Sequence, residues 1–159
     1  MSIPARLTSY LQQRGTRYEV CAHEHTRTSA QTARTAHVPP HQLAKSVLVE
    51  DDAGCLVAVL PADRQLKLGV LSRLLNRHSL RLADEARIST LLPDCDRGAV
   101  PALGMAWGLE TIVDDELEAI DVVYIEGGDH EQLLRLSHDQ FHTLMSDVQH
   151  GRFCGEAIH

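Results

Sequence analysis

The sequence predicts a single domain of the mixed α/β class, in which helices surround a mixed sheet. The chain has 159 residues, and its 43% hydrophobic and 23% charged residues are typical of one globular domain. Two β-rich segments separated by a short turn predict an antiparallel hairpin. Helical and strand-like segments alternate irregularly along the chain, which argues against a doubly wound parallel sheet.

The N-terminal part is predicted to contain two helices and a short strand. Apolar residues between Ile3 and Leu11 follow helical spacing, and Gly15 is suited to end this first helix. The segment "RYEVCA" is the expected strand. Thr28 and Gln31 have the spacing of a capping box, so a second helix is predicted to begin there and to stop before the next two prolines.

The hairpin is the clearest strand signal, with "KSVLVE" and "CLVAVLP" joined by the turn-forming "DDAG". After it, "LKLGVLSRLLN" and "ADEARISTLL" are predicted helices, and the first has a leucine-rich stripe that suits burial. The segments "TIVDDEL" and "DVVYIEGG" are predicted strands.

The C-terminal part begins with a predicted helix, "SHDQFHTLMSDV", in which Ser137 is the expected N-cap and Gln140 lies three residues later. The histidine-tipped end of the chain has no comparable pattern. We therefore assign residues 1–148 to the domain and expect residues 149–159 to form a flexible C-terminal tail.

Charge and hydropathy limit the partners of the protein. The net charge is −7, which disfavours non-specific DNA binding, although residues 1–50 hold more basic than acidic side chains and leave a local RNA contact open. No signal core or membrane-spanning stretch is present, so we expect a cytoplasmic protein without membrane contact. The four cysteines lack the CxxC spacing of a zinc knuckle.

Several common catalytic motifs are absent from the sequence. Without GxxxxGK[ST] or GxGxxG, nucleotide binding through a P-loop or Rossmann turn is excluded. Without a GxSxG elbow or a recognisable cysteine nucleophile, a covalent acyl-enzyme has no support. Any hydrolysis is therefore expected to use water.

The ten histidines raise the alternative of a metalloprotein. His23 with His25, and His37 with His41, have spacings at which imidazoles can share a metal. No carboxylate or cysteine completes an established ligand pattern, and two prolines interrupt the helix that would align the second pair. We assign no metal site and no cofactor, and keep a histidine-based metalloprotein as the weakest alternative.

Two loops and one lysine are candidate functional features. The loop "DRGAVPALG" can bring its backbone close to a ligand, and "YIEGGDHEQLL" ends a strand in two glycines followed by Asp129 and His130. Lys45 is one of only two lysines in the chain and directly precedes an apolar run. Taken singly, each feature has a structural explanation: glycine and proline mark turns, and a lysine at a strand entrance can extend to solvent.

Taken together and in order, these segments resemble the YbaK/ProXp family of free-standing aminoacyl-tRNA deacylases, whose fold is shared by the editing domain of bacterial prolyl-tRNA synthetases. The resemblance runs from "HEHTRTSAQTA" to "SHDQFHTLM". It is carried by the helix start Thr28-Ser29-Ala30, then "LAKSVLV", "VAVLPADRQL", "GAVPALG", "TIVDDEL" and "GGDH". It implies one domain with a curved, largely antiparallel mixed sheet.

The resemblance also implies a function, which is trans-editing: hydrolysis of the ester between a wrong amino acid and the 3′-terminal adenosine of tRNA-Pro or of another tRNA that carries a small amino acid. It makes Lys45 the catalytic residue. The implied substrate-binding residues are Thr28, Ser29, Gly98, Ala99, Val100, Pro101, Gly128, Asp129 and His130. The implied partner is the 3′ end of an aminoacyl-tRNA, and a synthetase is a further candidate.

Elementary chemistry agrees with this assignment. An aminoacyl ester is already activated, so an enzyme has mainly to position water and stabilise the oxyanion, for which a lysine ammonium and the backbone amides of Gly98 to Val100 are suited. Ala102 and Leu103 stand where family members commonly have a proline and an aromatic residue, so the acyl specificity stays open. A non-catalytic protein that binds an aminoacyl-tRNA end or an amino-acid-like ligand is the alternative.

Overall fold

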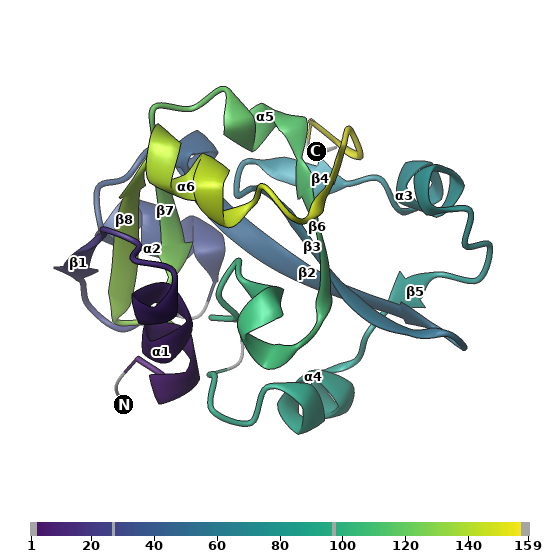
Figure 1. The fold of residues 1–159 in the computed structure, drawn as a ribbon, viewed down its shortest axis with the longest axis horizontal. Helices are drawn as coiled ribbons and strands as arrows, with labels where there is room; N and C mark the ends of the chain where they lie inside the picture. The colour runs from purple at the N-terminus through teal and green to yellow at the C-terminus, as the bar shows by residue number, and fades with distance from the viewer. Residues whose placement is uncertain (1–2, 27, 97, 157–159) are drawn as a thin grey trace.

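The computed structural model describes residues 3–26, 28–96 and 98–156, and an eight-stranded mixed sheet lies at its centre (Figure 1). The strand order is β1-β8-β7-β2-β3-β6-β9, and β5 pairs with β2 beside this path. The strands of this sheet are β1 (Glu19–Ala22), β2 (Leu43–Asp51), β3 (Gly54–Pro61), β5 (Arg81–Leu82), β6 (Glu110–Asp114), β7 (Val122–Glu126), β8 (Gln132–Ser137) and β9 (Gln149–Gly151). A second, two-stranded sheet pairs β4 (Arg64–Leu66) with β10 (Cys154–Glu156).

The pairings confirm a mixed sheet. Among the described strands, four pairs of the large sheet are antiparallel and three are parallel, so the antiparallel share is only slightly the larger. The parallel pairs join β2 to β7, β3 to β6 and β6 to β9. None of the described helices is long and apolar enough to cross a membrane.

The helices begin and end largely where local sequence signals place them. The Thr28 side chain accepts a hydrogen bond from the Gln31 amide, and Ser137 accepts one from Gln140, which confirms both predicted N-caps. Gly15 has a φ of 63° just after the first helix. The α-helices are α1 (Ala5–Gln13), α2 (Ser29–Thr35), α3 (Leu68–Leu75), α4 (Glu85–Leu91), α5 (Asp115–Glu118) and α6 (His138–Leu144), and the 3-10 helices are η1 (Pro40–Gln42) and η2 (Gly104–Trp107).

The two faces of the large sheet bury separate cores. On one face, α1, α6 and η2 pack with alternate β2 residues that include Ala44 and Leu48. On the other face, α2 packs near Leu43, and α3 packs near Val47 and Val49. Because successive strand residues point to opposite faces, Lys45 projects on the face of α2 and α3, while Ser46 projects on the face of α1 and α6.

Two local predictions differ from the structure. Strand β2 begins at Leu43, so Lys45 lies within the strand and not in front of it. The segment "TIVDDEL" was expected to be a strand throughout, yet β6 ends at Asp114 and α5 follows. The Asp114 side chain accepts a hydrogen bond from the Glu116 amide at 2.9 Å, and this cap starts the helix.

The C-terminal segment also differs from the expectation of a flexible tail over residues 149–159. The structure pairs β9 with β6 and β10 with β4. Phe153 lies between these two strands and is buried in the core with Leu71 of α3. Residues up to 156 therefore belong to the domain, while residues 157–159 lie outside the described part of the chain.

Candidate active site

Lys45 lines a cavity of about 490 Å³ on the α2 face of the sheet. Its backbone lies in β2 between two neighbouring strands, because Lys45 pairs with Leu60 of β3 and the preceding Ala44 pairs with Ile125 of β7. The other walls come from α2, the start of η1, the β3–β4 turn and β4. A strand held by neighbours on both sides has a fixed backbone, so the Lys45 side chain is well positioned to meet a ligand.

Partial burial lowers the pKa of the Lys45 ammonium, and the negative charge of Asp63, together with Cys154, only partly opposes this effect. Burial removes water from the ammonium, so its charge interacts more strongly with a ligand than it would at the surface. Such an environment suits electrostatic stabilisation of a developing oxyanion.

The segment that leads into α2 contacts the loop after β7. The Thr26 amide donates to the His130 carbonyl at 3.2 Å, and α2 begins three residues later at Ser29. Thr28 is exposed, and its side chain caps the helix. The structure therefore places Thr28, Ser29 and His130 in one region beside α2.

The loop of Gly128, Asp129 and His130 is buried rather than solvated. Asp129 is structural: its carboxylate accepts hydrogen bonds from the Glu131 and Gln132 amides and from the Gln132 side chain. His130 is 2% exposed and makes an edge-to-face contact with His25, with ring centroids 5.8 Å apart. His130 is therefore not a solvated loop histidine.

The loop of Gly98, Ala99, Val100 and Pro101 lies against a different cavity. Ser46 Oγ donates to the Pro101 carbonyl at 3.0 Å, and Ser46, Gly98 and Val100 line a cavity of about 190 Å³. Ala99 is fully buried, so its side chain does not face this cavity. The structure thus brings this loop to the residue after Lys45, but not into the cavity that Lys45 lines.

Glu126 is a buried acid of this region that the sequence analysis did not single out. It is 1% exposed, and neither carboxylate oxygen has a hydrogen-bond partner among the described residues. It follows Ile125, the partner of Ala44, so its backbone lies beside that of Lys45. The only signal in the sequence was one glutamate at the end of the apolar run "DVVYIE".

Burial raises the pKa of Glu126 to about 7, and the nearby Thr32 hydroxyl opposes the shift while Asp129 adds to it. The Thr32 hydroxyl also donates to the Thr28 carbonyl at 3.0 Å, so it opposes the shift only in part. Glu126 is therefore largely neutral below pH 7 and carries an unpaired buried charge above it.

Replacing Glu126 with glutamine is expected to stabilise the protein at pH 8 and to change little at pH 5. The folded protein holds the Glu126 proton more tightly than the unfolded chain does, so stability from this group is complete below pH 4.5 and is lost as the pH rises through about 7. The shift from 4.5 to about 7 corresponds to a gain of up to about 3 kcal/mol for the variant at high pH. Urea unfolding of both proteins at the two pH values measures it.

Glu24→Gln is the matched control, because Glu24 is an exposed glutamate in the segment between β1 and α2. This control should change stability little at either pH. Equal effects of Glu126→Gln at pH 5 and pH 8 would show that Glu126 does not titrate in this range.

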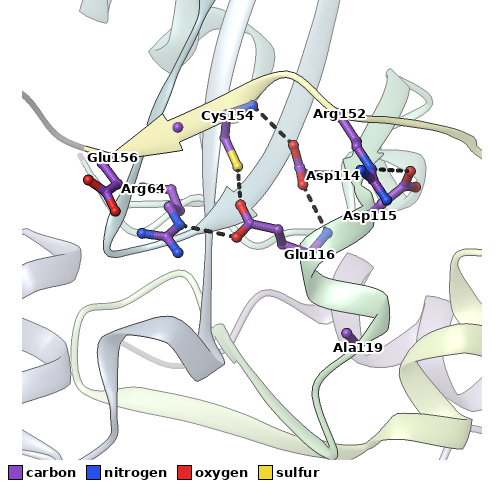
Figure 2. Close-up of a pocket in the computed structure, with 9 residues that line it drawn as sticks. Arg64, Asp114, Asp115, Glu116, Ala119, Arg152, Cys154 and Glu156 are labelled. Atoms are coloured by element: carbon purple, nitrogen blue, oxygen red, sulfur yellow. Dashed lines mark hydrogen bonds and ion pairs between the residues drawn. The ribbon is translucent and has the colours of Figure 1, made fainter.

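A further cluster joins the C-terminal segment to β6 and α5 (Figure 2). Asp114 accepts hydrogen bonds from the amides of Phe153 and Cys154 at 2.9 and 3.1 Å. The Cys154 thiol donates to Glu116 Oε2 at 2.8 Å, and Arg64 Nε donates to Glu116 Oε1 at 3.2 Å. Burial and the two carboxylates raise the pKa of the Cys154 thiol well above its usual range, so this cysteine is a poor nucleophile.

The ligand atoms of Asp114, Glu116 and Cys154 lie within 4.8 Å of one another, as in a candidate metal site. Each of the three already makes hydrogen bonds within the protein, which accounts for the cluster as a structural contact. Within the described ranges, no group of three potential metal ligands contains a histidine, so the histidine pairs are not brought together.

Comparisons with known proteins identify the family and agree with the fold. Residues 23–144 match the aminoacyl-tRNA editing domain family, and the chain belongs to this family. The matched range contains every residue proposed above for the substrate site. No curated protein matches the chain.

Solved structures share the fold at low sequence identity. A proposed trans-editing enzyme for prolyl tRNA synthetase is 24% identical, with a TM-score of 0.81 and coverage of 94% of this chain and 95% of that one. The hypothetical protein APE2540 is 24% identical, with a TM-score of 0.82 over 94% and 99% of the two chains. A protein from Marinobacter aquaeolei, described as acting in signal transduction, is 20% identical, with a TM-score of 0.77 over 96% of this chain but 31% of its own.

Proposed function

We propose that the protein is a trans-editing aminoacyl-tRNA deacylase that hydrolyses the ester of a mischarged tRNA, either tRNA-Pro or another tRNA carrying a small amino acid. The observation that carries the proposal is Lys45, a partly buried cation with a fixed backbone that lines a cavity in a chain of the editing domain family. The cavity volume of about 490 Å³ lies in the range of small-molecule sites.

In the proposed reaction, water attacks the ester carbonyl carbon and the bond to the ribose oxygen breaks. The amino acid and a tRNA with a free terminal hydroxyl are released. Lys45 donates a hydrogen bond to the carbonyl oxygen as negative charge develops on it, and this step needs no cofactor. The partner is the 3′ end of an aminoacyl-tRNA, with a synthetase as a second candidate, and the cytoplasm is the expected location.

The other proposed substrate residues have supporting roles. Thr28, Ser29 and His130 lie beside α2, on the face to which Lys45 projects, and are proposed to contact the terminal nucleoside or the acyl group. Gly128 and Asp129 hold His130 in place. Gly98 to Pro101 are proposed to contact the substrate from their separate cavity, where Ser46 joins them to β2.

The proposal is tested by incubating the protein with a panel of tRNAs that carry alanine, cysteine, serine or threonine, and by measuring ester loss over time. We expect hydrolysis of at least one mischarged tRNA well above the uncatalysed rate, with a correctly charged tRNA spared. Hydrolysis of none would contradict the proposal.

A non-catalytic binding protein is the second candidate, and one observation favours it. Lys45 and the Gly98 to Pro101 loop line separate cavities, so the two features are not assembled around one ligand site. Thermal stabilisation by a non-hydrolysable aminoacyl-adenosine, together with no ester loss in the tRNA panel, would support binding over catalysis.

A further inference from the structure

The Lys45 cavity is lined by more cationic than anionic side chains, although the net charge of the protein is −7. Three cationic side chains line it, from Arg34 of α2, Lys45 of β2 and Arg64 of β4, and Asp63 is the only carboxylate among its lining residues. The surplus is local, since the rest of the chain is acidic. A cavity of this kind selects an anionic ligand.

The contacts of these side chains leave the cations available. His41 Nδ1 lies 2.9 Å from Asp63 Oδ1, so the one carboxylate of the cavity is already held by a neighbour. Arg64 donates from its Nε to Glu116, and its two terminal NH2 groups have no hydrogen-bond partner among the described residues. Arg34 is exposed and makes no ion pair with another described residue.

A neighbouring cavity has a surplus of negative charge, so an anion is expected to bind on the Lys45 side of Arg64. Arg64 also lines this second cavity of about 490 Å³, which Figure 2 shows. Its walls include four carboxylates against the two cations Arg64 and Arg152; the acidic residues are Asp114, Asp115, Glu116 and Glu156. Phosphate oxygens are repelled from this side, so the charge along the surface changes sign at Arg64.

We propose that Arg34 and Arg64 form a phosphate subsite beside Lys45, which binds the phosphate on the 5′ side of the terminal adenosine. This inference rests on the proposed function. In an aminoacyl-tRNA the ester and this phosphate are carried by the same ribose, so one cavity can hold both groups. Arg64 is suited to this role because its planar guanidinium can donate two parallel hydrogen bonds to phosphate oxygens.

The direct test compares the binding of AMP and of adenosine, which differ only in the phosphate, by isothermal titration calorimetry. The wild-type protein is expected to bind AMP more tightly than adenosine, and more weakly as salt is raised. Arg64→Gln and Arg34→Gln are each expected to weaken AMP binding by about 10- to 100-fold while adenosine binding stays the same. Arg73→Gln is the control, because Arg73 is exposed on α3 and lines none of these cavities.

Glu116→Gln separates ligand binding from a structural effect. It removes the negative charge of the residue that holds Arg64 but keeps all three cations, so a modest change confined to AMP is expected. If Arg64→Gln acts only by loosening β10, both variants will weaken AMP and adenosine equally, and the subsite is then contradicted. Equal binding of AMP and adenosine by the wild-type protein would also overturn it.

Deacylation assays distinguish this inference from the proposed function. With aminoacyl-adenosine 5′-phosphate and aminoacyl-adenosine as substrates, Arg64→Gln should raise KM for the first and leave the second unchanged. Preferential AMP binding without any ester hydrolysis would keep the subsite and reject the enzyme. Ester hydrolysis that is indifferent to the phosphate would keep the enzyme and reject the subsite.

Discussion

Replacing Lys45 with alanine is expected to lower kcat/KM for ester hydrolysis by about 100- to 1,000-fold, the usual effect of losing one oxyanion donor. The loss should fall mainly on kcat, because the hydrogen bond to the carbonyl oxygen strengthens only as negative charge develops there. Initial rates of amino-acid release from the tRNA identified in the panel measure it.

The chain offers a close control for this experiment. Lys67 is the only other lysine, and it precedes α3 without lining the Lys45 cavity. Lys67→Ala should retain nearly full activity. Both variants should keep the thermal stability of the wild-type protein. Unchanged hydrolysis by Lys45→Ala would remove Lys45 from the mechanism.

The pH profile gives a second readout of the same lysine. Because burial lowers the pKa of Lys45 below the ordinary value of 10.5, its ammonium is lost at a lower pH than that of an exposed lysine. The rate of enzymatic hydrolysis, corrected for the spontaneous reaction, is expected to decline as the pH rises through the lowered pKa of Lys45. A rate that keeps rising to pH 10.5 would show that the ammonium form is not required.

Replacing Asp114 with alanine is expected to lower the free energy of unfolding by about 3 to 5 kcal/mol, because it leaves three backbone amides without their acceptor. Asp114 is 1% exposed and accepts from the amides of Glu116, Phe153 and Cys154. Two of these three bonds join the C-terminal segment to β6. Thermal unfolding should show a decrease of about 10 °C in Tm.

Asp115→Ala is the matched control for this stability prediction. Asp115 is the next residue but is partly exposed, and it makes only a loose ion pair of 3.8 Å with Arg152. Its loss should therefore cost less than about 1 kcal/mol. Hydrogen exchange at the Phe153 and Cys154 amides should accelerate in Asp114→Ala alone, and equal effects of the two variants would contradict the proposed role.

The parts of the fold that were predictable are those with local signals. The predictions of the β2–β3 hairpin and of the caps at Thr28 and Ser137 agree with the structure. Turns and helix caps depend on a few neighbouring residues, so the sequence alone indicates them. The short strands β4 and β10 were not predicted. A strand of three residues forms only because a distant partner is present, and its sequence carries almost no periodicity.

Some residues of the candidate site were predictable from the sequence and others were not. Lys45 was identified through the resemblance to a family and the order of its motifs, and its neighbours Arg34 and Arg64 were not, because only the folded chain brings α2 and β4 together. Glu126 and Asp114 were missed for a related reason. An acidic residue at a strand end is usually solvated, and nothing in its local sequence shows that the folded protein buries it.

The most direct test of the central claim, that the Lys45 cavity is the deacylation site, is a crystal structure with a non-hydrolysable amide analogue of aminoacyl-adenosine 5′-phosphate. The acyl group should be the one that the tRNA panel selects. We expect the amide carbonyl oxygen within hydrogen-bond distance of Lys45 Nζ and the phosphate beside Arg64. An analogue bound at Gly98 and Val100, with Lys45 making no contact to it, would contradict the account.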